Sequence, residues 1–248
     1  MSIIRRILIA LRFLTILPLP NKEVAAPREL GRSMAYFPLV GLFIGLLLMC
    51  VYTILIRFFS PLLTAVLLTG FWACFTGFLH LEGFVDAADG FSASQDKEKI
   101  LEVMKDHHCG AKGVIALAFL IILKITLVND TPSSVRFASF ILAPAIGRWV
   151  MVCAASICPY ARKGEGFGKV FVDNVKRKEL IIASSILIAA GIVLLQVKFI
   201  VLMIPVLVFT FLSCFYAKKK INGVTGDVLG AMNELAEAIS LGAFLLLR

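Results

Sequence analysis

Two long stretches without any charged residue constrain the fold of this chain more than any other feature. Residues 33–56 and 58–81 each lack Asp, Glu, Lys and Arg, and a helix that spans a bilayer needs about 20 mainly apolar residues. The composition agrees, because 60% of the 248 residues are hydrophobic and only 17% are charged, against about 25% charged in a soluble domain. These features exclude a disordered chain and a soluble globule, and they predict a polytopic membrane protein.

Further apolar segments bring the expected number of transmembrane helices to about seven. They cover residues 113–128, 137–158, 180–197, 199–217 and 228–247. Ionisable residues inside such segments are costly in lipid and face the bundle interior or a wet cavity. Here they are Lys124, Arg148, Glu234 and Glu237. We therefore expect an all-α helical bundle that forms a single integral membrane domain over residues 1–248.

The distribution of basic residues predicts the orientation of this bundle. Of 25 Lys and Arg residues, 19 fall in the segments 1–32, 82–112, 159–179 and 218–227, and only four lie on the other side. Because cytoplasmic loops carry such an excess, the N-terminus is expected in the cytoplasm and the C-terminus outside. The same bias explains the net charge of +9 without a nucleic-acid partner.

The first residues predict a helix that lies in the membrane interface rather than across the membrane. Residues 3–17 are apolar apart from three arginines, of which Arg5 and Arg12 share a helical face. A helix with one basic face and one apolar face suits the cytoplasmic interface. Pro18 follows and ends it. A plain membrane anchor is the alternative.

One acidic cluster predicts a metal site on the cytoplasmic side. Glu82, Asp86 and Asp89 are spaced by four and three residues, so a helix would place them within about 60° of arc. Like charges on one helical face repel each other, and a cation would relieve this repulsion. Carboxylate oxygens suit Mg²⁺, which commonly uses one or two carboxylates and the phosphates of a substrate. The alternative is a solvated helix face without a specific function.

A second acidic segment places Lys105 and Asp106 shortly before two glycines, Gly110 and Gly113. These glycines begin the third predicted span, and backbone N–H groups at a helix start can receive phosphate. Lys105 would add positive charge there. The segment therefore predicts an anion-binding site on the same side of the membrane as the first cluster.

A third acidic segment begins at Asp227, with Glu234 and Glu237 further along the same helical face. Carboxylates inside an apolar span are functional candidates, and for Asp227, at the membrane edge, a functional role is favoured. Arg148 lies about 15 Å from the cytoplasmic end of its span at 1.5 Å per residue. Pairing with Arg148 is the structural alternative for the glutamates, and for Glu237 both interpretations stay open.

These segments together predict Mg²⁺-dependent transfer of a phosphoryl group from a diphosphate. Catalysis of this kind is mainly positioning and charge neutralisation by metal and cations. The basic, glycine-rich segment 162–169, which contains Lys169, would cover an anionic substrate. Alternatively, the basic residues of that segment reflect only the excess of positive charge in cytoplasmic loops.

Four segments also carry a family resemblance. They are residues 13–18, 80–90, 104–106 and 225–237. Together they resemble cobalamin synthase, a family also called adenosylcobinamide-GDP ribazoletransferase, and the similarity runs through nearly the whole chain. The resemblance implies an integral membrane enzyme that needs Mg²⁺. It would join adenosylcobinamide-GDP to α-ribazole or its 5′-phosphate and release GMP, in the bacterial cytoplasmic (inner) membrane with the active site facing the cytoplasm.

Roles within that reaction follow from chemistry. Four carboxylates are expected around Mg²⁺: Glu82, Asp86, Asp89 and Asp227. Asp106 or Asp227 would be a second metal ligand or the base that takes the proton from the ribazole hydroxyl. Three cations are expected to neutralise charge at the leaving GMP: Lys105, Arg148 and Lys169. The sequence leaves open whether the protein forms a homo-oligomer.

Two other functions remain as alternatives. A CDP-alcohol or polyprenyl transferase would share the Mg²⁺–diphosphate chemistry, but the acidic segment lacks the Ala-Arg pair and the later spaced aspartates of the CDP-alcohol class. A secondary transporter would couple ions through Glu234 and Glu237. Transporters place such groups near the bilayer midplane and often have inverted repeats, whereas here the acids gather at the cytoplasmic edge and no repeat is visible.

Overall fold

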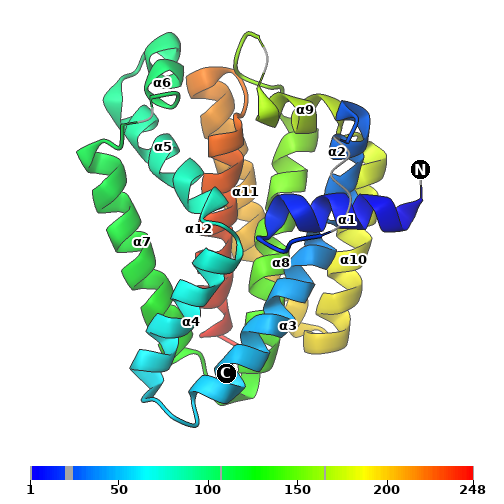
Figure 1. Ribbon diagram of the computed structural model, residues 1–248, viewed down its shortest axis with the longest axis vertical. Helices are drawn as coiled ribbons and strands as arrows, with labels where there is room; N and C mark the ends of the chain where they lie inside the picture. The colour runs from blue at the N-terminus through cyan, green and yellow to red at the C-terminus, as the bar shows by residue number, and fades with distance from the viewer. Residues whose placement is uncertain (1, 20–24, 107, 165, 248) are drawn as a thin grey trace.

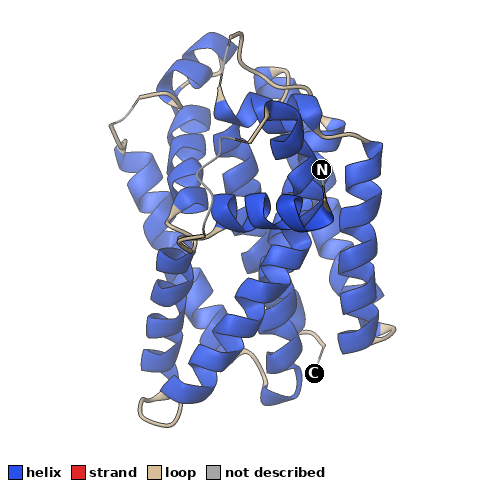
Figure 2. Ribbon diagram, turned by 45° about the vertical axis from the view of Figure 1, so that its right-hand side comes forward, coloured by secondary structure: helices blue, strands red, loops and turns tan. Residues whose placement is uncertain are grey.

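A computed structural model describes residues 2–19, 25–106, 108–164 and 166–247. Within these residues the regular structure is helical and contains no strand (Figure 2), which confirms the all-α prediction. The elements are α1 Ile3–Leu14, α2 Pro27–Ser33, a 3₁₀ turn Met34–Tyr36, α3 Phe37–Leu55, α4 Pro61–Phe75, α5 Leu79–Ala93, α6 Lys97–Val103, α7 Ala111–Asp130, α8 Ser133–Ile157, α9 Phe167–Asn174, α10 Arg177–Leu195, α11 Lys198–Ile221 and α12 Gly226–Phe244.

The long apolar helices make this a multi-pass membrane protein. Among the described residues, five segments are long and apolar enough to cross a bilayer: Pro27–Leu55, α7, α8, α10 and α11. The pair α4 and α5 would make a sixth. The expected seventh span corresponds to α12, which contains three carboxylates and has fourteen of its nineteen residues buried. Its neighbours shield α12 from lipid, so it needs no apolar surface of its own.

The second predicted span, 58–81, is wrong as a continuous helix. The chain breaks after α4 and turns by 91° into α5. Gly77 and Phe78 both have positive φ at this break, 62° and 58°, a conformation that ends an α-helix. The turn gives α5 its own direction (Figure 1), and α5 carries all three carboxylates of the first acidic cluster.

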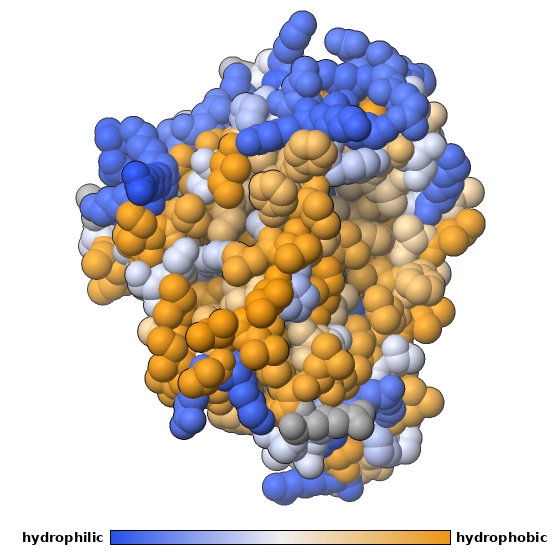
Figure 3. Space-filling view, turned by 180° about the vertical axis from the view of Figure 1, so that it is seen from behind, coloured by the Kyte–Doolittle hydropathy of each residue, from blue (hydrophilic) through white to orange (hydrophobic). Residues whose placement is uncertain are grey.

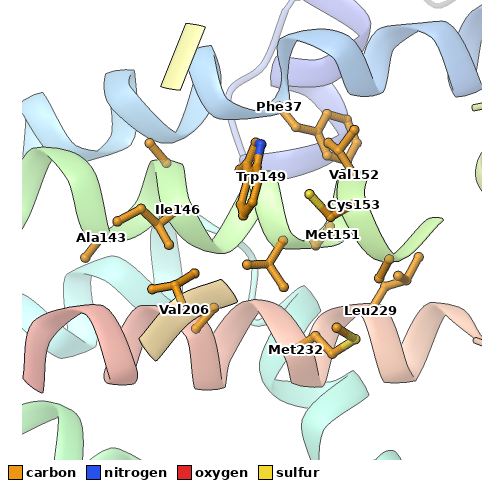
Figure 4. Packing of buried hydrophobic residues seen from close by; sticks show 14 of the residues in the cluster. Phe37, Ala143, Ile146, Trp149, Met151, Val152, Cys153, Val206, Leu229 and Met232 are labelled. Carbon is orange, nitrogen blue, oxygen red and sulfur yellow. The ribbon is translucent and has the colours of Figure 1, made fainter. Parts of the chain in front are cut away.

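Helix α8 is the centre of the bundle. Nineteen of its 25 residues are buried, and Figure 4 shows its side chains packed between α3 and α12. Gly41 and Gly45 of α3 meet α8 so closely that a Cβ atom at Gly45 would lie 2.5 Å from the Ile141 Cα atom. Small residues four apart allow such backbone contact in membrane bundles, so these glycines set the distance between α3 and α8.

The surface divides into an apolar belt and one strongly polar end. Figure 3 shows hydrophobic residues around the side of the bundle and hydrophilic residues gathered at one end. This polar end carries α6, α9 and the segments that join them to their neighbours (Figure 1). Helix α1 lies across the bundle near the same end, and Arg6 holds it to Glu29 of α2 through a 2.9 Å ion pair. The predicted N-terminal helix is therefore confirmed as a helix.

Candidate active site

A cavity of about 250 Å³ lies at the polar end, between α5, α12 and the segment that joins α8 to α9. Its polar wall consists of His80, Glu82, Asp86, Tyr160, Arg162 and Asp227. Its apolar wall includes Phe13 of α1, Phe37 of α3 and Phe171 of α9, whose rings pack together with centroids 4.6–5.9 Å apart. The cavity therefore has a charged wall and an aromatic wall, and α1 contributes Phe13 to the aromatic wall.

Helix α5 brings two of its three carboxylates to this cavity. Glu82 and Asp86 line it. Asp89, one turn further along, is used differently: its two oxygens accept the backbone N–H groups of Gly110, at 2.8 Å, and Gly113, at 2.7 Å. The anion at the start of α7 is thus a side chain of the protein itself, and a phosphate would have to displace Asp89 to reach these amides.

Asp227 enters the cavity from the first turn of α12 and is held by Arg162. The Arg162 Nη2 atom donates to Asp227 Oδ2 at 2.7 Å and to the Met104 carbonyl at 3.2 Å. Both partners are partly buried, with side-chain exposures of 16% and 22%. Because the cavity still reaches both groups, this ion pair is accessible to a small anionic ligand.

The backbone explains why residues 65 positions apart meet here. Ala161 donates to the Val224 carbonyl, and Val224 donates to the Pro159 carbonyl, both at 2.9 Å. These bonds tie the segment after α8 to the turn before α12. Thr225 then caps α12 by accepting the Val228 N–H. These backbone hydrogen bonds therefore bring Arg162 and Asp227 into contact.

Helices α5 and α12 approach closely beside the carboxylates. A Cβ atom at Gly83 would lie 3.0 Å from both the Asp227 Cα atom and its carbonyl oxygen. Contact this tight leaves no room for a side chain at that position. The close approach places Glu82, Asp86 and Asp227 around one cavity although they come from two helices.

The donor set fits Mg²⁺ together with a phosphate ligand rather than a closed protein cage. Among the residues that the structure describes, no three His, Cys, Asp or Glu side chains converge as a ready-made metal site. Mg²⁺ is usually held by one or two carboxylates and completes its shell with water and substrate phosphates. Glu82, Asp86 and Asp227 supply such carboxylates around one cavity.

A second ionic cluster lies deep in the bundle, and its two cations and two carboxylates pair with one another. The Lys124 Nζ atom lies 2.5 Å from both Glu234 Oε2 and Glu237 Oε2. Arg148 pairs with the other oxygen of Glu237, and Asn233 donates to both glutamates. The expected alternative of Glu237 paired with Arg148 is confirmed, with Lys124 as an additional partner. Arg148 is fully buried and does not line the cavity.

Three other predicted residues lie outside the cavity. Asp106 follows α6, is 56% exposed at its side chain and accepts a 2.7 Å hydrogen bond from the His108 ring. Lys105 is exposed beside it and lines a separate pocket on α6. Lys169 lies on α9 next to Gly168, which does line the cavity. Their predicted roles stay predictions.

The comparison with known proteins gives the family. A family model described as cobalamin-5-phosphate synthase matches residues 6–245. The chain belongs to this family. The match covers every residue named above in the cavity and in the interior cluster.

The relatives align with this family member over nearly the full length of its chain. A protein of Thermoanaerobacter pseudethanolicus is 36% identical over 245 residues, 98% of each chain. Proteins of Caldanaerobacter subterraneus and Acetivibrio thermocellus are 35% and 34% identical over 248 residues, with all of this chain covered. All three are named adenosylcobinamide-GDP ribazoletransferase. No solved structure matches this chain.

The sequence did not single out Arg162 as the partner of Asp227. It predicted only a basic segment over 162–169, because loop charge carries no information about distant partners. The signal that was available is the position of Arg162, five residues after the end of the most buried helix and shortly after Pro159 and Tyr160. In this cobalamin-5-phosphate synthase family member, the long-range bridge of Tyr160 to Val224 turns that position into a site residue.

Proposed function

We propose that this protein is an adenosylcobinamide-GDP ribazoletransferase. It would join adenosylcobinamide-GDP to α-ribazole, or to α-ribazole 5′-phosphate, and release GMP. The observation that carries the proposal is the cavity in which Glu82, Asp86, Asp227 and Arg162 meet, in a chain whose full-length relatives carry that name. The N-terminus and this cavity would face the cytoplasm of a bacterial inner membrane, in agreement with the loop charges.

The proposed reaction moves one phosphoryl group between two oxygens. A ribazole hydroxyl attacks the phosphorus that is attached to the cobinamide, and a new P–O bond forms. The bond from this phosphorus to the bridging oxygen breaks, and its electron pair leaves with GMP. The hydroxyl proton passes to a carboxylate, for which the geometry favours Asp227 over Asp106, since Asp227 lines the cavity.

Charge neutralisation is the main task of the protein in this reaction. Mg²⁺, when bound, would screen the phosphate oxygens and stabilise charge on the leaving group. Glu82 and Asp86 would hold it, which leaves Asp227 to take the hydroxyl proton. Arg162 would take the place expected for Arg148 at the phosphates, because it lines the cavity and presents a planar set of donors. When a diphosphate engages Arg162, Asp227 is released from its ion pair.

The interior cluster argues against the transporter alternative. A coupling site must exchange its ion, whereas Glu234 and Glu237 are paired with Lys124 and Arg148 inside the bundle. All four side chains are at most 6% exposed. The carboxylates available to a ligand are those at the polar end.

The test is GMP release by purified protein in lipid vesicles, supplied with adenosylcobinamide-GDP and α-ribazole. We expect release that depends on ribazole and Mg²⁺ and that EDTA abolishes. Asp130→Asn serves as the matched control. This exposed carboxylate lies at the C-terminal end of α7, whereas Asp89 contacts the N-terminal end of α7 at Gly110. The variant should behave as wild type. Folded protein that releases no GMP would contradict the proposal and would direct the assay to lipid acceptors.

A further inference from the structure

A second pocket adjoins the cavity on its outer side. It has a volume of about 300 Å³, at the lower end of the roughly 300–1,000 Å³ typical of small-molecule sites. We name it the α6 pocket; it is lined by Lys97, Glu98, Leu101, Glu102, Lys105, Ala161, Arg162 and Lys163. Arg162 lines both spaces, so the carboxylate cavity and the α6 pocket lie on either side of this side chain.

We propose that the α6 pocket binds the guanosine monophosphate end of the diphosphate substrate and, after the reaction, the GMP product. This inference rests on the proposed function and adds the place and the means of nucleotide recognition. The substrate would straddle Arg162, with its reacting phosphorus on the carboxylate side and its nucleoside on the α6 side.

The cations of the α6 pocket suit the phosphate of a departing nucleotide. Lys97, Lys105 and Lys163 line it together with Arg162. The Arg162 Nη2 atom is used by Asp227 and Met104, but its Nε atom is buried and has no partner among the described residues. A phosphate oxygen at the border would pair with the Arg162 guanidinium in a charge-assisted hydrogen bond.

The carboxylates of the α6 pocket suit guanine rather than adenine. Guanine presents two adjacent N–H donors, at N1 and N2, and a carboxylate can accept both. Adenine presents an acceptor at N1, which a carboxylate repels. Glu102 is engaged by Lys99 at 3.0 Å, whereas Glu98 has no ion-pair partner within the described part of the chain. Glu98 is therefore the proposed guanine acceptor.

A larger cavity nearby lacks the chemistry for a nucleotide. It measures about 460 Å³ between α5, α11 and α12 and is lined by apolar and aromatic residues, among them Phe84, Phe91 and Tyr216, with no Lys or Arg. A phosphate placed there would lose its hydration without gaining a cation. The comparison favours the α6 pocket for the charged end of the substrate.

The experiment measures binding of GMP and AMP to the full-length protein in vesicles by equilibrium dialysis, alongside turnover. The wild type should bind GMP about tenfold more tightly than AMP, the scale of one charge-assisted hydrogen bond. Glu98→Gln should bring the GMP:AMP ratio near one. Lys163→Ala should weaken both nucleotides by the same factor, and Lys219→Ala, an exposed lysine of α11 outside the pocket, should change neither.

The outcomes separate this inference from the proposed function. If the wild type releases GMP in the ribazole-dependent assay but Glu98→Gln, alone and combined with Glu102→Gln, keeps the wild-type GMP:AMP ratio, the pocket assignment is overturned and the function stands. If the wild type releases no GMP, the function itself fails. Glu98 and Lys163 are exposed, so their substitution tests binding without putting the fold at risk.

Discussion

Helix α12 carries carboxylates into two regions that differ in how completely their charge is matched. Glu234 and Glu237 lie in the interior with Lys124 and Arg148, two cations for two anions. Asp227, two turns earlier, shares a cavity with Glu82 and Asp86. There, three carboxylates face one arginine. The charges of the interior cluster balance each other, whereas the cavity has an excess of negative charge.

This difference distinguishes carboxylates that stabilise the bundle from carboxylates that are available to a ligand. A buried charge without a partner costs several kcal/mol, so an interior carboxylate persists only with its cation in place. Carboxylates that line the cavity are reached by water, so a missing cation costs less there. The two regions should therefore respond in opposite ways to loss of one charge.

The largest expected effect is on stability, from Glu237→Gln. This change leaves Arg148 and one contact of Lys124 without a counter-charge inside the bundle. We expect a loss of about 3–5 kcal/mol in the free energy of unfolding, the cost of breaking a buried ion pair. Unfolding in mixed micelles by a denaturing detergent measures it.

A double variant sharpens this result. Arg148→Met with Glu237→Leu removes both charges, and its loss of stability should be smaller than the sum of the two single losses, because no charge is left unpaired. Wild-type stability of Glu237→Gln would show that the interior cluster does not hold the bundle together.

The second effect is on turnover, from Asp86→Asn. Asp86 lines the cavity and has no ion pair among the described residues, so this carboxylate is available to a ligand there. We expect GMP release to fall by about 10²–10³-fold, as for the loss of one group that stabilises charge in a transition state. The unfolding transition should stay close to that of the wild type. Wild-type turnover of Asp86→Asn would remove this carboxylate from the proposed site.

Hydrophobic segments and local spacing were sufficient to predict most of the long helices and which carboxylates share a helix. They predicted the pairing of Glu237 with Arg148 as an alternative, but not Lys124 as a partner of both glutamates. The spacing of Glu82 and Asp86 placed them correctly on one helix, α5. The break before α5 was not predicted. None of the residues 58–81 is Asp, Glu, Lys or Arg, so no charged residue marks the turn, which depends on the backbone at Gly77 and Phe78.

Contacts between distant segments account for the rest of what was missed. The pairing of Arg162 with Asp227 depends on the bridge between Tyr160 and Val224, and nothing in the local sequence encodes that bridge. Likewise, the glycines at 110 and 113 predicted an anion at the start of α7, but the structure places the carboxylate of Asp89 there. The local sequence identified an anion as the partner of these N–H groups, but it could not show that the anion is a side chain of the protein rather than a phosphate.

A smaller effect on turnover is expected from Arg162→Lys. Lysine keeps the charge but cannot reach Asp227 and the Met104 carbonyl with one planar group as arginine does. We expect about a tenfold fall in kcat/KM, the cost of one charged hydrogen bond. Arg12→Lys, on α1 outside the cavity lining, is the matched control. Equal kinetics of the two variants would mean that only the charge of Arg162 matters.

The smallest effect is expected from Asp89→Asn, and it decides to which region Asp89 belongs. Its two oxygens accept the Gly110 and Gly113 N–H groups at the start of α7, and an amide can accept only one of these bonds well. The expected loss is about 1 kcal/mol of stability, as for one hydrogen bond at a helix start. Turnover should fall much less than in Asp86→Asn, measured in the same vesicles, because Asp89 supports α7 rather than the ligand. A fall in turnover as large as that of Asp86→Asn, with stability unchanged, would instead place Asp89 among the metal ligands, and α7 would then have to release it when substrate binds.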